Sequence, residues 1–263
     1  MLRTITYSVL TLSLLLTPWA NTYAEEEATT AAATDKKEGE HPLDPEIRDA
    51  KKRLAALEER VQDYSCRFIK QERVGGELRD HEIIDMKVRH EPFSVFMDFL
   101  KPDDVAGQQV AYVEGENDGK LIAKPVGLAG VLGPVSLKPD GPLAMNGQRY
   151  PITHVGFVNL TKELIMVAEM DRQYGECQVK HYKGAKLGDR VCTVTEVIHP
   201  VRRKNFRFHK VHIFVDDELD LPVRFASWTW PEEEGGKPVL QEEYIYSNIK
   251  LNPGFTDDDF KIE

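Results

Sequence analysis

The sequence predicts an α+β domain in which two main helices lie against the concave face of one strongly curved antiparallel sheet of about ten strands. Three observations predict it. An amphipathic stretch follows Asp44, a second stretch with helical spacing follows Pro151, and runs that alternate apolar and polar residues fill most of the remainder. Because these runs follow one another through short turns, we expect hairpin connections rather than βαβ crossovers.

The N-terminal segment has the pattern of an export signal. In residues 1–24 a short positive start at Arg3 is followed by an apolar stretch and then by small residues up to Ala24, which is typical of a cleaved signal peptide. An uncleaved anchor is the alternative, because Thr22 is uncommon three residues before a cleavage point. We therefore expect a periplasmic or otherwise exported protein that keeps no stable transmembrane anchor after processing.

Residues 25–42 form an acidic and alanine-rich leader. The leader has no large aliphatic or aromatic side chain, so it cannot offset the entropy of ordering and is predicted to be disordered. The remaining residues, 43–263, are long enough for one domain with a substantial core.

The net charge of −10 argues against nucleic acid and against an anionic membrane surface as the main partner. Basic residues gather once, in residues 201–210 (VRRKNFRFHK). This run is interpreted as a solvated strand edge that discourages aggregation, with a local docking patch as the alternative.

Three cysteines are present in a chain that is expected to reach an oxidising compartment. Cys177 and Cys192 flank a strand–turn–strand pattern centred near Gly184, so a cross-strand disulfide between them is one expectation. Cys66 would then be a buried thiol. Other pairings stay open.

The first half of the domain begins with a helix. Asp44, Pro45 and Glu46 give an N-cap, a first-turn proline and a first-turn acid, and the helix places Ile47 and Leu57 on an apolar stripe. Period-two runs follow and predict strands over residues 65–73, 81–89, 92–100, 108–115 and 120–125, the last two joined by a tight turn at ENDG.

An uncharged loop interrupts these strands. Residues 125–137, PVGLAGVLGPVSL, contain three glycines and two prolines, which resist regular structure. We interpret the loop, extended to about residue 150, as a cover over the mouth of an apolar cavity, because an exposed patch of this kind marks a ligand or partner site.

The second half repeats the pattern. Residues 152–170 carry apolar side chains at helical spacing and predict the second helix, with Pro151 at its start. Strands are then predicted over residues 175–182, 190–198, 205–218, 221–230 and 238–251.

The final strands carry a family resemblance. LDLPVRFASW, followed by YIYSNIKLNPGFTDDDF, is similar to the ending of the LolA/LolB-like lipoprotein-carrier superfamily, and more narrowly to an uncharacterised family of exported bacterial proteins of unknown function within it. The likeness spans residues 64–260. It implies an incomplete barrel whose helices cover a cavity for acyl chains. In the carriers an arginine inside the barrel is thought to gate the cavity. Arg67, Arg89 and Arg224 lie on predicted strands here, but none falls in a motif that aligns with that role.

Catalytic signatures are not found. His81, Glu82 and Asp85 resemble half of a zinc-protease motif, but the last position is not histidine. DDELD at residues 216–220 lacks the glycine and the closing glutamate of a calcium loop. The histidines have no metal-ligand spacing, and no nucleophile elbow is present. We therefore expect neither an enzyme, a metal site nor a cofactor.

The features that remain are apolar and aromatic. One face of a curved sheet would line the interior. The candidates for contact with lipid are Phe93, Val95, Met97, Phe99, Leu121, Leu128, Val131, Leu132, Phe225 and Trp228. Further residues on predicted strands, or their alternates, are Phe206, Phe208, Phe214, Trp230, Tyr244 and Tyr246. Each of these is equally explained as ordinary core.

The sequence therefore predicts an exported protein that binds lipid or an acylated protein in an apolar cavity. The alternative is an envelope protein–protein adaptor, in which the apolar loop and a sheet edge dock a protein partner and the core is fully packed. The presence of an open apolar cavity distinguishes the two.

Overall fold

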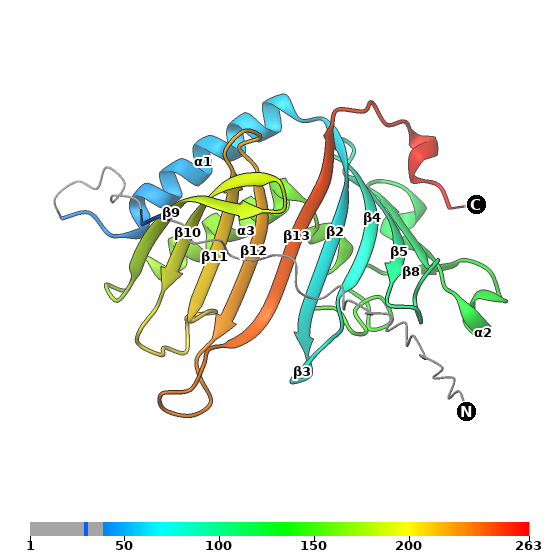
Figure 1. Ribbon diagram of the computed structural model, residues 1–263. Helices are drawn as coiled ribbons and strands as arrows, with labels where there is room; N and C mark the ends of the chain where they lie inside the picture. Colours follow the sequence, from blue (N-terminus) through cyan, green and yellow to red (C-terminus); the bar gives the residue numbers. More distant parts are fainter. Residues whose placement is uncertain (1–28, 31–38, 263) are drawn as a thin grey trace, which may run out of the picture.

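One antiparallel sheet organises the computed structural model, which describes residues 29–30 and 39–262. The signal-peptide prediction and most of the predicted leader lie outside the described residues. The sheet follows the order β1-β9-β10-β11-β12-β13-β2-β4-β5-β6-β7-β8, with β3 paired to β2 alone. The edge strands β1 and β8 lie at opposite ends of this order, so the sheet is not closed. Figure 1 shows that the sheet is curved. The predicted half-barrel architecture is confirmed.

The strands form in two meanders that meet where β13 pairs with β2. The bounds of the strands are β1 Thr29–Thr30, β2 Asp63–Val74, β3 Glu77–Leu78, β4 Glu82–Arg89, β5 Ser94–Lys101, β6 Gln109–Val113, β7 Leu121–Lys124, β8 Val135–Leu137, β9 Gln178–Leu187, β10 Arg190–Ile198, β11 Lys210–Asp216, β12 Pro222–Thr229 and β13 Val239–Leu251.

Two long helices cover one face of this sheet, and both lie behind it in Figure 1. They are α1, Leu43–Arg60, and α3, Phe157–Asp171. Short helical turns complete the chain: η1 Asn117–Gly119, α2 Gly127–Gly130, η2 Ile152–His154 and η3 Asp257–Phe260. Among residues 39–262, no helix is long and apolar enough to span a membrane.

The helix α1 packs on α3 and over the β9–β12 half of the sheet. Ion pairs join the two helices at their exposed edges, Lys162 to Glu58 at 2.7 Å and Lys51 to Glu169 at 2.5 Å. Arg53 reaches the turn after β11, where its Nε lies 2.7 Å from Asp220 Oδ1. Exposed pairs of this kind add little stability, so burial of Ile47 and Leu57 is the main reason that α1 stays in place.

The second helix is shorter than the sequence predicts. It begins at Phe157 rather than near Ile152, because Gly156 adopts φ +102° and interrupts the helical path. The first helix begins at Leu43, and Asp44 lies inside its first turn. Here the Asp44 carboxylate accepts a hydrogen bond from the backbone N–H of His41 at 3.2 Å.

The hairpin between β9 and β10 corrects the disulfide prediction. Its turn lies after Leu187, four residues later than predicted from Gly184. Cys192 therefore faces Ala185, whereas Cys177 precedes the far end of β9, where Gln178 pairs with Ile198. No disulfide joins Cys177 and Cys192, although both lie within the described residues and both are buried.

The end of α3 that faces the middle of the sheet is fixed by three aromatic rings. The ring of Phe157 lies 4.5 Å from that of Tyr64 and 4.6 Å from that of Tyr246, centroid to centroid. The Phe157 N–H also donates to Tyr64 Oη at 3.2 Å. Tyr64 and Phe157 are both completely buried, so this cluster joins α3 to the two central strands, β2 and β13.

A substitution at Gly156 tests this attachment. A Cβ at Gly156 would meet Tyr64 Oη at 2.8 Å, and φ +102° is strained for any residue with a side chain. We expect Gly156→Ala to lower the free energy of unfolding by about 3 kcal/mol, measured by urea denaturation. Gly175→Ala is the matched control, since nothing lies within 4 Å of its added Cβ. Equal stability of the two variants would contradict this account of the junction.

Candidate functional site

The concave face of the sheet is only partly covered, and two cavities lie beneath the helices. The first, which we call the strap cavity, has a volume of about 170 Å³ and lies against β2, β4–β7, β12 and β13. The second, the helix cavity, has a volume of about 540 Å³ and lies between α1, α3 and β9–β12. Leu164, Val167 and Phe208 border both and form the wall between them.

The strap cavity takes its name from residues 138–155, which cross the concave face as an irregular segment and are called the strap here. Pro139, Ala144 and Tyr150 of the strap line the cavity. Opposite them, strand positions of one parity point inward because side chains alternate along a strand. These positions are Phe68, Ile84, Met97, Phe99, Leu121, Phe225, Tyr244 and Tyr246.

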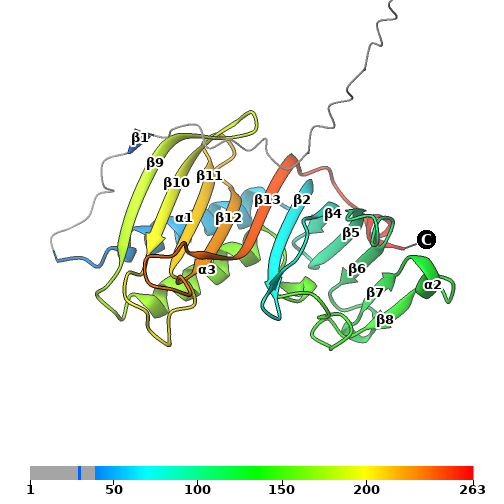
Figure 2. The same ribbon diagram turned by 60° about the horizontal axis from the view of Figure 1, so that its bottom comes forward.

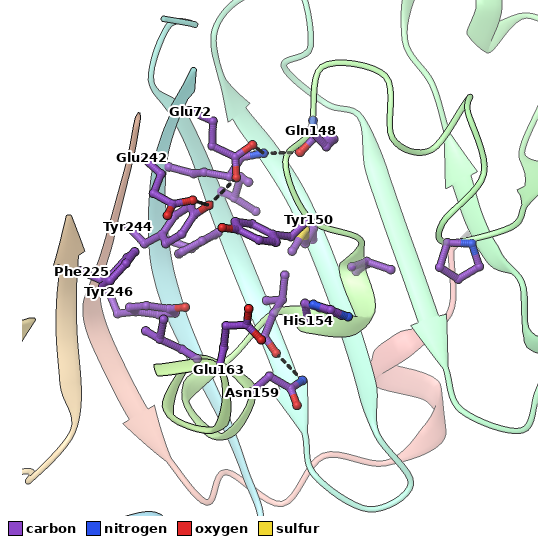
Figure 3. A pocket seen from close by; sticks show the side chains of 18 of the residues that line it. Glu72, Gln148, Tyr150, His154, Asn159, Glu163, Phe225, Glu242, Tyr244 and Tyr246 are labelled. Carbon is purple, nitrogen blue, oxygen red and sulfur yellow. Dashed lines mark hydrogen bonds and ion pairs between the residues drawn. The ribbon is translucent and has the colours of Figure 1, made fainter. Parts of the chain in front are cut away.

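Buried charges form a polar corner of the strap cavity. Glu242 is completely buried, and Glu72 is 5% exposed. Arg149 of the strap joins them: its Nε donates to Glu242 Oε2 at 3.0 Å and its backbone N–H donates to Glu72 Oε2 at 2.9 Å. The Tyr244 hydroxyl donates to Glu72 Oε1 at 2.6 Å (Figure 3).

Further partners complete this corner. Ser227 Oγ donates to Glu242 Oε1 at 2.9 Å, and Arg149 Nη1 donates to the carbonyl of Arg73 at 3.0 Å. Lys70 Nζ lies 2.7 Å from Glu82 Oε2 and also bonds Gln148 of the strap. Each buried carboxylate thus has a cationic or hydroxyl partner, which is the condition for keeping a charge in an apolar interior.

The pKa directions follow from this burial. Removal from water raises the pKa of Glu242, and the adjacent Arg149 guanidinium opposes that rise. Burial, and then the neighbouring Glu242, raises the pKa of Tyr150 to about 12. Figure 3 shows Tyr150 and Tyr244 pointing toward one another across the cavity. The two phenols therefore stay protonated and serve as hydrogen-bond donors.

Four of the predicted contact residues border the strap cavity: Met97, Phe99, Leu121 and Phe225. Val95 is fully buried and Phe93 packs against the same core, but neither borders the strap cavity or the helix cavity. Trp228 does not line one either. It lies three positions after Phe225 and so faces the other side of β12, where its ring contacts His212 at 4.9 Å.

The predicted cover is placed differently. Leu128, Val131 and Leu132 are 93%, 80% and 87% exposed and line neither cavity. They belong to residues 126–134, called the apolar tip here, which connect β7 to β8 at one end of the sheet (Figure 2). The loop therefore covers the cavity only with its second part, the strap.

The three strand arginines considered for the gating role do not border either cavity. Arg67 pairs with Asp85 and Arg224 with Glu243, and neither lines a cavity. Arg89 is likewise absent from both cavities. An arginine of the basic run from Val201 to Lys210 does border a cavity. Arg207 lines the strap cavity and pairs with Glu163 of α3. Most of this run precedes β11 and is not itself a strand edge.

Sequence reasoning missed the polar corner and the whole helix cavity. The signal for the corner was present, because Glu242 alternates with Tyr244 and Tyr246 and must share their inward face. No pattern marked Arg149, which lies in an irregular segment. Among the described residues, no group of three or more histidine, cysteine, aspartate or glutamate side chains is placed to hold a metal ion.

The fold and its cavities define an open half-barrel with an internal apolar space. Residues 61–263 match the family described as "Protein of unknown function (DUF1571)", and the chain belongs to that family. No match was found among curated proteins. The membership confirms the expectation of a family of unknown function.

Solved structures with a similar shape include three bacterial proteins. An outer membrane lipoprotein-sorting protein domain from Vibrio parahaemolyticus is 14% identical, with 82% of this chain and 95% of that chain covered and a TM-score of 0.40. The lipoprotein LppX from Mycobacterium tuberculosis is 12% identical, with 81% and 98% covered and a TM-score of 0.44. A LolA superfamily protein from Nitrosomonas europaea is 12% identical, with 81% and 97% covered and a TM-score of 0.34.

Removal of Arg149 tests the polar corner. In Arg149→Met, Glu242 is left buried without its cation, and we expect a loss of about 3 kcal/mol in the free energy of unfolding. The double variant Arg149→Met/Glu242→Gln should recover most of that loss. The control is Lys101→Met, because Lys101 pairs with the exposed Asp103 and should matter little. Urea denaturation of the four proteins measures the difference, and full stability of Arg149→Met would refute the arrangement.

The same variant should show a defined pH dependence. Arg149 lowers the pKa of Glu242, so its removal raises that pKa further above the ordinary value of 4.5. A carboxyl whose pKa is higher in the folded protein binds its proton more tightly when folded, and stability falls as pH rises through that range. The deficit of Arg149→Met should therefore grow between about pH 4.5 and neutrality, as urea midpoints at several pH values would show. A constant deficit would contradict a charged Glu242.

Proposed function

We propose that this protein is exported and binds lipid, holding acyl chains in the apolar space between the sheet and its helices. The single observation that carries the proposal is the pair of cavities, because an ordinary core is packed to near-crystalline density with few voids larger than a water molecule. The helix cavity alone, at about 540 Å³, falls within the range of small-molecule sites.

Dispersion and area burial supply the affinity in this proposal. Each buried methylene of a chain contributes about 0.8 kcal/mol, so one long chain needs no covalent or ionic anchor. The walls are suited to such a ligand, since Ile165, Val167, Val197, Val211 and Ile213 face the helix cavity. This function needs no catalytic step, no metal and no cofactor.

The lipid content of the purified protein tests the proposal. We expect protein prepared without detergent to carry lipid that mass spectrometry detects after extraction with organic solvent. Ala168→Trp in the helix cavity and Ala144→Trp in the strap cavity place an indole where the chain would lie, and each should lower occupancy by about tenfold at its own site, equivalent to about 1.4 kcal/mol.

The apolar tip provides the matched control for this experiment. The triple variant Leu128→Asp/Val131→Asp/Leu132→Asp changes only exposed side chains outside both cavities, and its lipid content should equal that of the parent. A lipid-free, stable parent protein would overturn the carrier proposal. It would favour the second candidate function, an envelope protein–protein adaptor.

We propose a separate role for the apolar tip, namely contact with a lipid surface. Three large apolar side chains project from it almost fully exposed, far more than a soluble surface normally gathers in one place. Lys120, Lys124 and Lys138 are the charged residues between Asp118 and Asp140, so the tip is locally basic although the whole chain is acidic. Apolar side chains flanked by lysine suit the boundary between headgroups and acyl chains.

Vesicle binding tests the role of the tip. We expect the parent protein to sediment with phosphatidylglycerol vesicles, and the triple aspartate variant to lose most of that binding while keeping its internal lipid. High salt should weaken the parent's binding only in part, because the apolar contribution is not screened. Equal sedimentation of the two proteins would contradict membrane contact through the tip.

A further inference from the structure

A buried histidine lies at the wall of the helix cavity. His199, directly after β10, is 3% exposed, and Asp171, the last residue of α3, is 4% exposed; both side chains border the cavity. Neither ring nitrogen of His199 forms a hydrogen bond of good geometry with a described residue, although the Phe208 backbone is close enough to oppose the lowering of the His199 pKa by burial. The nearest acidic oxygen, Asp171 Oδ2, lies 3.4 Å from Nε2.

The ring of His199 is held in this position by its surroundings. It stacks on the ring of Phe206 with centroids 4.1 Å apart. The backbone is fixed as well, because the His199 N–H donates to the carbonyl of His209 at 2.8 Å and the His199 carbonyl accepts from His209 Nδ1 at 2.9 Å. The stack and the backbone hydrogen bonds therefore hold the ring against the wall of the helix cavity.

The protonation states of His199 and Asp171 limit the ligands that this pair can bind. Burial lowers the pKa of His199 to about 4, so at neutral pH its ring is uncharged and has one N–H donor and one acceptor nitrogen. Burial raises the pKa of Asp171 to about 6, and at neutral pH its carboxylate accepts hydrogen bonds only. Together they offer one donor and at least two acceptors at the edge of an apolar space.

We propose that His199 and Asp171 bind the hydroxyl group of a neutral lipid whose chain occupies the helix cavity. A hydroxyl donates one hydrogen bond and accepts others, so it can donate to Asp171 or to the bare ring nitrogen of His199 and accept from the ring N–H. A fatty acid carboxylate is disfavoured, because it cannot donate and would face the Asp171 charge. An alkane would leave the polar pair unsatisfied.

This inference rests on the proposed lipid-binding function and adds a headgroup preference to it. Two apolar residues of the same cavity, Ile165 on α3 and Val197 on β10, lie on the elements that carry the pair, and Leu43 borders the cavity from α1. A ligand bound there has a chain in contact with these residues and a hydroxyl at His199. Its polar end points into the protein, not out to solvent.

Competition with the neutral dye Nile red measures this preference on the lipid-stripped protein. The probes are 1-hexadecanol, palmitate and hexadecane, which share a chain length and differ at one end. We expect hexadecanol to displace the dye at concentrations at least about tenfold lower than the other two. His199→Phe keeps the ring stack on Phe206 and should lose the advantage of hexadecanol, with hexadecane unchanged.

A second variant keeps the test decisive if His199→Phe does not fold. Asp171→Asn retains the shape of the side chain and removes its charge, so palmitate binding should strengthen while hexadecanol binding changes less. A purely structural role of Asp171 would not move the palmitate result. His154→Phe, in the strap cavity, is the control that should leave all three affinities unchanged.

The failures of the two proposals are distinguishable. If neither the dye nor any probe binds, the lipid-binding function itself is refuted. If the three probes bind the parent with equal affinity, or if His199→Phe changes none of them, the function stands and the hydroxyl site is refuted, with an ordered water as the occupant of the pair.

Discussion

The packing of Phe157 between Tyr64 and Tyr246 is the contact on which the rest of the concave face depends. It fixes the start of α3 on β2 and β13, the two strands at the centre of the sheet. A curved sheet of this width offers more apolar surface than one helix can cover. Because α3 is held over the centre, uncovered surface remains on both sides of it, and each side becomes a cavity.

The two cavities are closed by different means. Over β9–β12 the cover is a second helix, α1, which meets the sheet mainly through apolar side chains such as Ile47. Over β4–β7 the cover is the strap, an irregular segment with many backbone polar groups that must be satisfied. Glu72 meets part of that need, because its carboxylate accepts from the Arg149 backbone N–H, while the Arg149 guanidinium bonds Glu242 and a carbonyl of β2. The polar corner is thus a consequence of covering a sheet with coil.

Much of the fold was predictable from the sequence because it depends on local periodicity. Alternation located all of the long strands, and helical spacing located both long helices. Parity along β5, β7 and β12 placed Met97, Phe99, Leu121 and Phe225 on the inward face. The same alternation places Trp228 elsewhere, because an odd separation from Phe225 sends it to the opposite face of β12.

The remaining parts of the site depend on contacts between distant segments. Periodicity does not give the offset of a hairpin turn, and a shift of the β9–β10 turn was enough to separate Cys177 from Cys192. Nor does composition give the path of an irregular segment. The apolar tip and the strap are adjacent in sequence, yet the first projects from the end of the sheet and the second lies beneath it.

The two cavities are separated by a wall of side chains that borders both of them. Leu164, Val167 and Phe208 border both spaces, so a ligand that displaces them joins the two volumes. The ends of the combined space differ in chemistry. The charges in the strap cavity already have hydrogen-bond partners in the protein, whereas neither ring nitrogen of His199 has a hydrogen bond of good geometry among the described residues, with Asp171 Oδ2 3.4 Å away. A buried polar group that is left unsatisfied favours whatever completes its hydrogen bonds, so in the proposed complex this asymmetry, rather than the apolar walls, would set the orientation of the lipid.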